Sequence, residues 1–475
     1  MVTKSVSPSP WASLRNVVKQ PVVAGVLLVV YLLIATFILS NLNRRDLWFP
    51  LYSTLTFPML VLAPFLILAA PLRVQIKALL IVVVLFLIIP YLGIRDSSYL
   101  ELIIQICIFA GLALGLNIVV GFAGLLDLGY IAFFAVGAYT WGMVSSQANT
   151  IFYINGWLVS GAAFYGFIFI GVGVAALVGI LLGLPVLRLR GDYLAIVTLG
   201  FGEMIRVIAN NLDKPINLTN GSQGLFNVGH PPVPPFLFNA VVSAQGTLGL
   251  PTDNAEPLAQ QLLFYVIGIV MVAVIIVVAR RLDNSPIGRA WTAIREDEVA
   301  AIAMGVPLVR MKLMAFAMGA SFAGAIGVLY GAKQTFVSPE SFSLIQSISI
   351  LAMVIVGGIG GIRGALFGAV IVTLLNLLVL KNMSLQINAL RNVDFIVPLI
   401  NFHIRDWPTQ LEPAKYERFI FGLLLIVMMI FRPAGLLPEP RRRMEMKAGS
   451  DDVEDSPTPA EEPAATAAQP DAGNV

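Results

Sequence analysis

Two charged residues, Glu203 and Arg206, interrupt a long apolar segment at residues 193–212. Residues three apart lie on the same face of a helix, so the carboxylate and the guanidinium can pair. A charge buried in lipid is costly unless it is paired, and we therefore expect these side chains to face each other or a partner. Two interpretations stay open here: a wall of a translocation path, or a structural ion pair near the outer edge of a membrane.

The residue types needed for enzymatic chemistry do not occur in the required patterns. The chain has no Gly-x-x-x-x-Gly-Lys-Ser/Thr loop, so it cannot bind and split ATP by the P-loop route. Its single cysteine, Cys107, lies in an apolar run and is expected to be a small core residue. His230 and His403 lie far apart in loops. We therefore expect a protein that is not an enzyme and that holds neither a cofactor nor a metal.

The composition is that of a membrane protein. The chain is 58% hydrophobic and 12% charged, with a mean hydropathy of +0.86, whereas soluble domains carry about 25% charged residues. Apolar runs of roughly 20 residues recur, which predicts an all-α polytopic bundle of about 10–12 membrane segments. The candidate spans are residues 22–40, 50–70, 74–93, 99–120, 129–145, 158–184, 193–212, 260–280, 311–331, 344–360, 364–380 and 417–431.

The distribution of basic residues predicts the orientation. Residues 213–259 contain one basic residue, Lys214, and should lie outside the cytoplasm. Residues 285–307 and their flanks are rich in basic residues and should be cytoplasmic. Counting the spans from there places both termini in the cytoplasm as well. The pair Arg44-Arg45 falls on the outer side, against the rule. The basic residues in and beside 285–307 are Arg280, Arg281, Arg289, Arg295, Arg310 and Lys312.

The segment 285–307 is charged, short and helix-prone, and it lies between two long apolar segments. We expect a helix with charged ends and a centre of small residues, closed by a glycine. Such a helix is suited to fit a groove of another protein, and a membrane domain could receive force from a soluble motor in this way. The residues assigned to this contact are Arg289, Arg295, Glu298, Ala300, Ala301 and Gly305.

Glycines and a few polar residues mark the inner part of the predicted bundle. Glycines that recur every fourth residue let helix backbones approach closely in lipid. A run of four glycines in residues 357–361 breaks a helix, and it predicts either a tight cytoplasmic hairpin or a broken helix that lines the pathway. The packing or pathway residues are Asn117, Gly121, Gly124, Thr198, Glu203, Arg206, Gly357, Gly358, Gly360 and Gly361.

Several segments together resemble the M-type permease subunits of ABC importers for branched-chain amino acids. The segments are residues 115–129, 188–203, 219–225, 285–289 and 431–438, and the resemblance covers roughly 99–438. It makes 285–307 similar to the family's coupling helix, with a departure: Val299 stands between Glu298 and the two alanines. It also suggests that the loop with Thr219, Gly221 and Gly224 meets a binding protein, although a plain exposed loop is equally compatible.

The resemblance implies a set of partners in a bacterial inner membrane. They are a second permease subunit forming a heterodimer, two cytoplasmic ATPase subunits that hydrolyse ATP, an extracytoplasmic solute-binding protein and the surrounding lipid, without nucleic acid. This chain would supply half of the pathway. Urea and short-amide importers belong to the same family and stay possible. An ion-gradient-driven secondary transporter is the rival of another class, with Glu203 as its titrating carboxylate.

Three regions are expected. Residues 1–98 form an N-terminal extension with about three transmembrane helices, and residues 99–438 form the permease core. Residues 439–475 form an acidic cytoplasmic tail, expected to be disordered because it is rich in Pro, Ala and Ser and lacks apolar periodicity. Within the long connector 381–416, residues 388–402 are a candidate interfacial amphipathic helix.

Overall fold

The computed structural model describes residues 21–41, 49–148, 159–186, 192–392, 396–397, 402–403, 408, 410 and 412–437. In this part of the chain, nine helices are long and apolar enough to cross a membrane, and three shorter apolar helices accompany them. The all-α polytopic fold expected from the sequence is confirmed. The acidic tail lies outside the described residues.

The first half of the chain, up to residue 211, contains eleven helical elements in its described part. They are α2 (Pro21–Asn41), α3 (Phe49–Ala69), α4 (Val74–Val83), η1 (Val84–Ile88), α5 (Ile89–Arg95), α6 (Ser97–Leu116), η2 (Asn117–Phe122), α7 (Ile131–Ser145), η3 (Gly161–Ala163), α9 (Phe164–Val186) and α10 (Asp192–Asn211). The segment 193–212, with its two charges, is thus one continuous helix.

The remaining elements complete the bundle. They are η4 (Gly221–Gln223), α11 (Pro235–Thr247), α12 (Ala255–Asp283), α13 (Pro286–Glu296), α14 (Glu298–Ala303), α15 (Leu308–Gln334), η5 (Pro339–Phe342), α16 (Leu344–Gly357), α17 (Ile362–Leu374), η6 (Leu375–Leu380), α18 (Lys381–Asn392), β1 (Ile396–Val397), β2 (Phe402–His403), η9 (Pro413–Tyr416) and α19 (Glu417–Phe431).

The prediction of an amphipathic helix at 388–402 is wrong. Helix α18 ends at Asn392, and the chain continues into β1 and β2, which pair antiparallel. Pro398 opposes a helix through residue 397, because the residue before a proline is pushed towards the extended region. The helix of this connector therefore lies earlier in the sequence than the pattern suggested.

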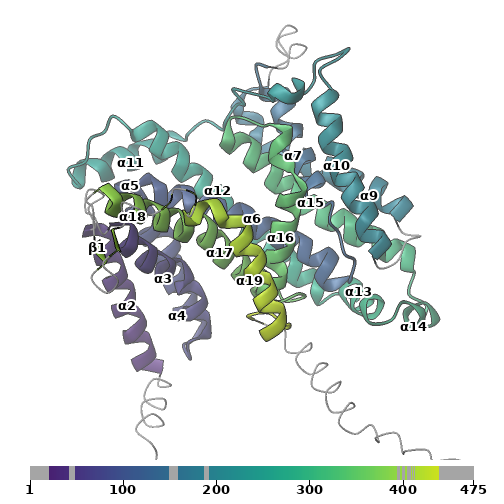
Figure 1. Cartoon of the computed structure of the whole chain (residues 1–475), viewed down its shortest axis with the longest axis horizontal. Coiled ribbons are helices and arrows are strands. Elements are labelled where there is room, and N and C mark those ends of the chain that lie inside the picture. Colours follow the sequence, from purple (N-terminus) through teal and green to yellow (C-terminus); the bar gives the residue numbers. More distant parts are fainter. Residues whose placement is uncertain are drawn as a thin grey trace, which may run out of the picture.

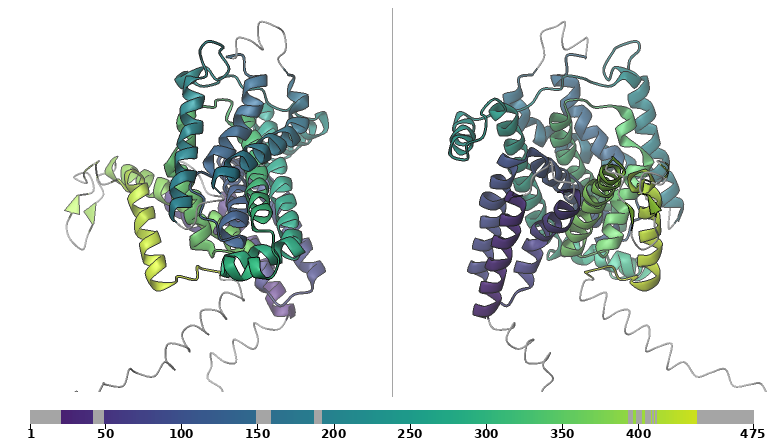
Figure 2. Two further views of the ribbon diagram at one scale, coloured as in Figure 1. Left: turned by 90° about the vertical axis from the view of Figure 1, so that its right-hand side faces the viewer. Right: turned by 60° about the vertical axis from the view of Figure 1, so that its left-hand side comes forward.

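Helices α6 and α15 occupy the middle of the bundle (Figure 1). Helix α15 packs on α7 and α9 with backbone-to-backbone contact. A Cβ added to Gly137 of α7 would lie 2.2 Å from the Gly324 carbonyl oxygen, and one added to Gly324 would lie 2.5 Å from the Gly171 oxygen of α9. Small residues therefore allow the close approach that drives helix packing in lipid. Helices α2 and α19 stand at the margins of the bundle (Figure 2).

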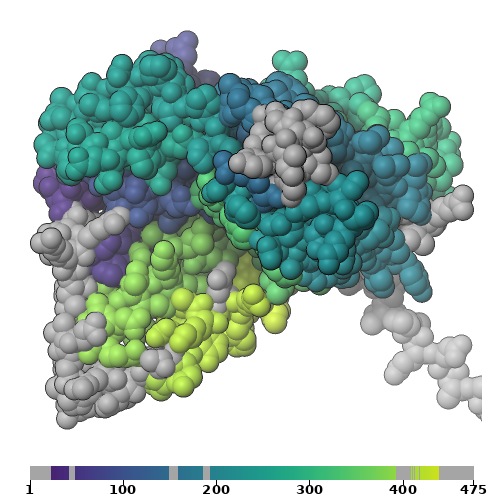
Figure 3. Space-filling model, turned by 90° about the horizontal axis from the view of Figure 1, so that it is seen from above, coloured from purple at the N-terminus to yellow at the C-terminus, as the bar shows by residue number. Residues whose placement is uncertain are grey.

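The two ends of the bundle differ. Helices α13 and α14 lie at one end, at the bottom right of Figure 1, and we call it the α13–α14 end. Helix α11 and the turns around η4 lie at the opposite end, which we call the α11 end. Seen from the α11 end, these elements cover much of the surface, and the region of α17 to α19 lies beside them (Figure 3).

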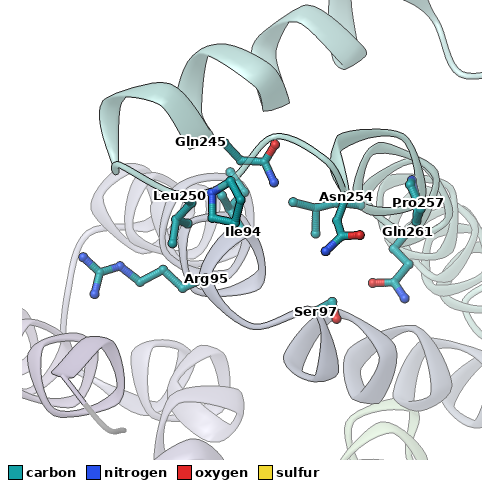
Figure 4. A pocket seen from close by; sticks show the side chains of 10 residues that line it. Ile94, Arg95, Ser97, Gln245, Leu250, Asn254, Pro257 and Gln261 are labelled. Carbon is teal, nitrogen blue, oxygen red and sulfur yellow. The ribbon is translucent and has the colours of Figure 1, made fainter. Parts of the chain in front are cut away.

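The extension packs against the core at the α11 end. The Tyr265 hydroxyl of α12 donates a hydrogen bond to the Leu85 carbonyl oxygen at 2.5 Å, and the rings of Phe57 and Tyr99 stack at 4.6 Å. A cavity of about 320 Å³ lies at this junction (Figure 4). Gln245 and Gln261 line it, whereas Arg95 reaches away to donate a hydrogen bond to the Ser40 carbonyl oxygen at 2.6 Å.

Candidate functional site

Residues 123–130, between η2 and α7, form an unwound segment inside the bundle. Side chains of two other helices hold its Leu128 peptide. The Leu128 N–H donates to Thr198 Oγ1 of α10 at 3.0 Å, and Ser347 Oγ of α16 donates to the Leu128 carbonyl oxygen at 2.6 Å. Irregular backbone at membrane depth needs such partners because lipid offers none. Thr198, a predicted pathway residue, therefore ties α10 to the unwound segment.

Asp127 lies in the same segment and is a residue that the sequence analysis missed. It is 1% exposed, and its Oδ1 accepts a hydrogen bond from the Gly129 N–H at 2.9 Å. Its Oδ2 has no partner among the described residues, and it borders a cavity of about 10 Å³, enough for one water. The available signal was an acidic residue in the short Gly-Leu-Leu-Asp-Leu-Gly break between two apolar runs.

Asn117 joins η2 to the glycine-rich run. Its Oδ1 accepts a hydrogen bond from the Gly360 N–H at 2.9 Å, and the residue is buried. Gly121 lies one turn further along η2. A Cβ at Gly121 would lie 2.2 Å from Asn117 Oδ1 and 2.8 Å from the Gly360 nitrogen, so only glycine fits there.

The glycine run forms a tight hairpin between α16 and α17, which is one of the two interpretations left open. Gly358 and Gly360 have φ angles of +120° and +91°, which side chains rarely adopt. A Cβ at Gly357 would lie 1.9 Å from the Gly364 carbonyl oxygen. The chain that follows α19 also binds here, since the Leu437 N–H donates to the Gly357 oxygen at 3.0 Å. Gly361, the last residue of the run, caps α17.

The single helix expected in 285–307 is in fact two helices. The backbone breaks at Asp297, where φ is −152° and ψ is 112°, and the Asp297 side chain caps α14 by accepting from the Val299 and Ala300 N–H groups. Aspartate favours such a cap because its side chain competes with helical hydrogen bonds. Gly305 then ends α14 with a φ of +81°, as expected for a glycine that closes a helix.

Helix α13 is fixed to the bundle by two side chains. Arg295 Nη1 donates to the Gly121 carbonyl oxygen at 2.8 Å, and the arginine stem fills the space beside Gly124, where a Cβ would lie 2.6 Å from Arg295 Cγ. Trp291, which the sequence analysis did not single out, is fully buried and donates from Nε1 to the Met311 oxygen at 2.7 Å. Contacts therefore run from α13 through η2 to the hairpin.

Helix α14 and Met304, the residue that follows it, expose apolar side chains. Val299, Ile302 and Met304 are 65%, 49% and 84% exposed, whereas Ala301 is 3% exposed. We call Val299, Ile302 and Met304 the α14 apolar face. The sequence analysis chose the two alanines and regarded Val299 as an insertion, but the spacing of Val299 and Ile302 already placed them on one helix face.

The other residues proposed for the contact at 285–307 have separate positions. Glu298 pairs with the buried ammonium group of Lys312 on α15. Arg289 of α13 is exposed, and so is Ala300 of α14.

The Glu203–Arg206 pair expected from the sequence is present, with a third member. Arg206 Nε donates to Glu203 Oε1 at 2.9 Å, and Arg206 Nη1 donates to Glu340 Oε1 of η5 at 2.8 Å. The Glu203 side chain is 42% exposed. Arg206 therefore joins α10 to η5, which also contacts η4 at the α11 end.

The turn with Thr219, Gly221 and Gly224 lies at the α11 end. Gly221 and Gly224 have φ angles of +54° and +71°, so both use the freedom that glycine provides. Thr219 is fully buried, and its Oγ1 donates to the Ala209 carbonyl oxygen of α10 at 2.7 Å. Its side chain anchors the loop and is not part of the surface.

The structure places the predicted residues in separate groups. Asn117, Gly121, Gly124, the glycine hairpin and Arg295 meet near the α13–α14 end. The other residues predicted at this end lie on or directly after α13 and α14, and they are Arg289, Glu298, Ala300, Ala301 and Gly305. Thr198 holds the unwound segment, and Glu203 with Arg206 lies beside η5. Thr219, Gly221 and Gly224 belong to the turn at the α11 end.

These features define a class of protein, an all-α polytopic membrane protein with a helical projection at one end. The family described as "branched-chain amino acid transport system / permease component" matches residues 98–429. The chain belongs to this family and is the permease component of a transport system. The family match begins where the N-terminal extension ends, at the start of α6.

Individual relatives agree with the M-type resemblance. The chain is 34% identical over 383 residues to the high-affinity branched-chain amino acid transport system permease protein LivM of Salmonella typhimurium, covering 79% of this chain and 77% of the relative. It is 35% identical over 367 residues to LivM of Escherichia coli, covering 76% and 74%. It is 22% identical over 334 residues to the high-affinity branched-chain amino acid transport system permease protein LivH of Escherichia coli, covering 70% of this chain and 92% of the relative. No solved structure matches the chain.

Proposed function

We propose that this chain is one permease subunit of an ATP-driven importer and forms half of the pathway for branched-chain or related hydrophobic amino acids. The names of its relatives support the substrate class. The observation that carries the coupling mechanism is the chain of contacts from Arg295 of α13, next to α14, to the centre of the bundle. An exposed apolar face on a short helix suits a groove in a partner protein.

In this mechanism a partner ATPase moves α13 and α14 as it closes on ATP. Arg295 passes the movement to η2 through its hydrogen bond to the Gly121 oxygen. Asn117 passes it to the α16–α17 hairpin through the Gly360 N–H. Because the hairpin is packed backbone to backbone, it moves as one unit rather than deforming.

The proposal includes the partners and the orientation. The α13–α14 end faces the cytoplasm and two ATPases, with both termini on that side of a bacterial inner membrane. The α11 end faces outward and meets a solute-binding protein, as the scarcity of basic residues in 213–259 supports. A second permease subunit completes the pathway, and ATP hydrolysis takes place in the partners.

The contacts of Glu203 weigh against an ion-gradient mechanism. A coupling carboxylate has to gain and lose a proton in the course of each cycle. Glu203 is held by Arg206, which also pairs with Glu340, and it is 42% exposed. An arginine partner stabilises the ionised form of a carboxylate. The arrangement supports a structural pair that links α10 to η5.

Uptake in liposomes tests the proposal. The complete complex, with its partner subunits and binding protein, is expected to accumulate L-leucine only when ATP reaches the ATPases. Glu203→Gln should lower the rate but keep the ATP dependence. Uptake driven by a pH gradient alone, without ATP or ATPases and lost in Glu203→Gln, would replace this proposal with the secondary transporter.

A further inference from the structure

A cavity of about 350 Å³ lies between α6, α16 and α17, beneath η5. Its volume falls in the range of small-molecule sites, roughly 300–1,000 Å³. Glu340 of η5, whose side chain is 68% exposed, marks its mouth towards the α11 end. Met353 and Thr373 lie at its inner end, where a Cβ at Gly368 would be 2.0 Å from the Met353 carbonyl oxygen. Close packing of α16 on α17 therefore separates the cavity from the hairpin.

Two residues that line this cavity each carry a buried polar atom without a partner in the described part of the chain, Thr373 Oγ1 and Asn376 Oδ1. Thr373 is 1% exposed. The two residues are three apart, on one face of α17 and η6. A buried polar group without a partner costs about 1–3 kcal/mol, so such groups normally serve a bound molecule or water.

Within the described chain, the one charged residue that lines the cavity lies at its mouth. This residue is Glu340, and it shares the guanidinium of Arg206 with Glu203. The inner polar groups are neutral amides and hydroxyls, from Gln105, Gln346 and Ser349 in addition to Thr373 and Asn376. A ligand with a net charge would lose hydration there without a counter-charge, whereas a molecule of zero net charge with several hydrogen-bonding groups is well matched.

Another part of the cavity lining is apolar. Ile108, Phe134 and Met353 are buried residues that line it, and Leu377 and Tyr330 add to it. An aliphatic chain of a few carbons would gain about 0.8 kcal/mol for each CH₂ that it buries against such a wall. Urea or a short amide would satisfy the polar side and leave this wall uncovered.

We propose that this cavity binds the transported solute as a zwitterionic α-amino acid with an aliphatic side chain. Thr373 and Asn376 hold its polar end, and the wall of Ile108, Phe134 and Met353 receives its side chain. The inference rests on the proposed function and names the site within it. Because the mouth lies at the α11 end and the hairpin closes the other, the site has the position of an outward-facing one.

The cavity at the junction with the extension is a weaker candidate for this role. Gln245 Oε1 and Gln261 Oε1 are also unpartnered there among the described residues. That cavity lies beneath α11 at the edge of the bundle, and Arg95, which borders it, is directed away (Figure 4). It has no contact with the hairpin or η2 that would link it to α13.

A cysteine protection experiment tests the site in the intact complex. Cys107 is replaced by serine, and Ser349→Cys places a thiol in the cavity. We expect millimolar L-leucine to slow modification of this thiol by a methanethiosulfonate reagent at least fivefold, and L-lysine, L-glutamate and urea to leave it unchanged. Ser243→Cys on α11 is the matched control, because both serines bond the carbonyl oxygen four residues earlier, and leucine should not protect it.

Substitutions separate binding from folding. Thr373→Val removes an unpartnered hydroxyl without changing shape, so the melting temperature should stay the same or rise, while leucine uptake falls about two- to tenfold, the equivalent of one hydrogen bond. Asn376→Leu should lower uptake further. Thr140→Val on α7, whose hydroxyl bonds its own helix at Val136, should leave uptake unchanged.

The outcomes are distinguishable from failure of the proposed function. If the wild-type complex imports leucine with ATP but leucine gives no protection and Thr373→Val transports normally, this site is wrong and the function stands. If urea protects the thiol in place of leucine, the zwitterion is wrong. If the wild-type complex imports no hydrophobic amino acid, the proposed function itself fails.

Discussion

Arg295 connects α13 with η2 in the interior of the bundle. Its stem packs on Gly124, which has a φ of +70°, and its guanidinium bonds the Gly121 oxygen at 2.8 Å. A hydrogen bond from a charged donor contributes about 1.5–3 kcal/mol. Because Arg295 contacts both helices, it can transmit a movement of α13 to η2.

Arg295→Met tests this link, because methionine keeps the packing on Gly124 and loses the hydrogen bond. We expect the rate of ATP-driven uptake to fall about tenfold or more, with normal insertion and with ATPase subunits still bound. Arg281→Met, at the exposed end of α12, is the control and should transport normally. A normal rate in Arg295→Met would show that force reaches the bundle by another contact.

At the residue scale, the sequence predicted a contact between near neighbours but not the contacts between distant residues. The Glu203–Arg206 pair and the importance of Asn117 follow from the cost of polar groups in lipid. The third partner Glu340 and the partnership of Gly121 with Arg295 could not be predicted, because they join residues 134 and 174 positions apart. Asp127 was missed because its short loop looked like an ordinary connector.

Helix α14 is the element that differs most from its sequence-based description. The pattern of small residues favoured Ala300 and Ala301 as the contact, but Ala301 faces the protein and the α14 apolar face points outward. Helical periodicity fixes which residues share a face and leaves open which face is covered. The break at Asp297 depends on a cap that competes with helix continuation, and such boundaries are weakly encoded.

Crosslinking tests the α14 apolar face. In a Cys107→Ser background, Met304→Cys is expected to crosslink to a partner ATPase, because its side chain is 84% exposed. Ala301→Cys on the same helix should react poorly, since that position is 3% exposed. Equal crosslinking at both positions, or labelling of Met304→Cys by an impermeant reagent from outside intact cells, would contradict the docking role.

The α16–α17 hairpin makes a prediction about stability. Gly357→Ala would force a methyl group to within 1.9 Å of the Gly364 oxygen, and such overpacking costs about 1–3 kcal/mol. The melting temperature of the purified protein in detergent should fall. Gly422→Ala in α19 is the control: nothing lies within 4 Å of its Cβ, and alanine favours a helix, so the melting temperature should stay or rise. A destabilised Gly422→Ala with an unchanged Gly357→Ala would mean that the hairpin does not pack this way.

The molecule as a whole combines the part that matches the family, residues 98–429, with the helices that precede it. The core begins at α6, and α2 to α5 pack on its flank through residues such as Phe57 and Leu85. The all-α polytopic class followed from hydropathy, since lipid allows few alternatives to a helix. The arrangement of the helices around α6 and α15 depends on glycine contacts between distant segments, which a single sequence does not reveal.

The orientation of the whole molecule is open to a direct test. Thr252 lies in an exposed turn between α11 and α12. A protease site inserted there should be cut in intact cells by protease added outside, because few basic residues surround it. A site inserted beside Arg289 should be cut only after the cells are opened. The reverse result would place the α13–α14 end outside and remove the proposed ATPase contact.

The backbone hydrogen bonds of Leu128 also offer a way to follow the transport cycle. Its N–H is held by a hydroxyl of α10, and its carbonyl oxygen is held separately by a hydroxyl of α16. An amide exchanges its hydrogen for solvent deuterium when its acceptor leaves. The deuterium uptake of this one amide, followed with and without ATP, would therefore record how often α10 separates from the unwound segment, without any attached label.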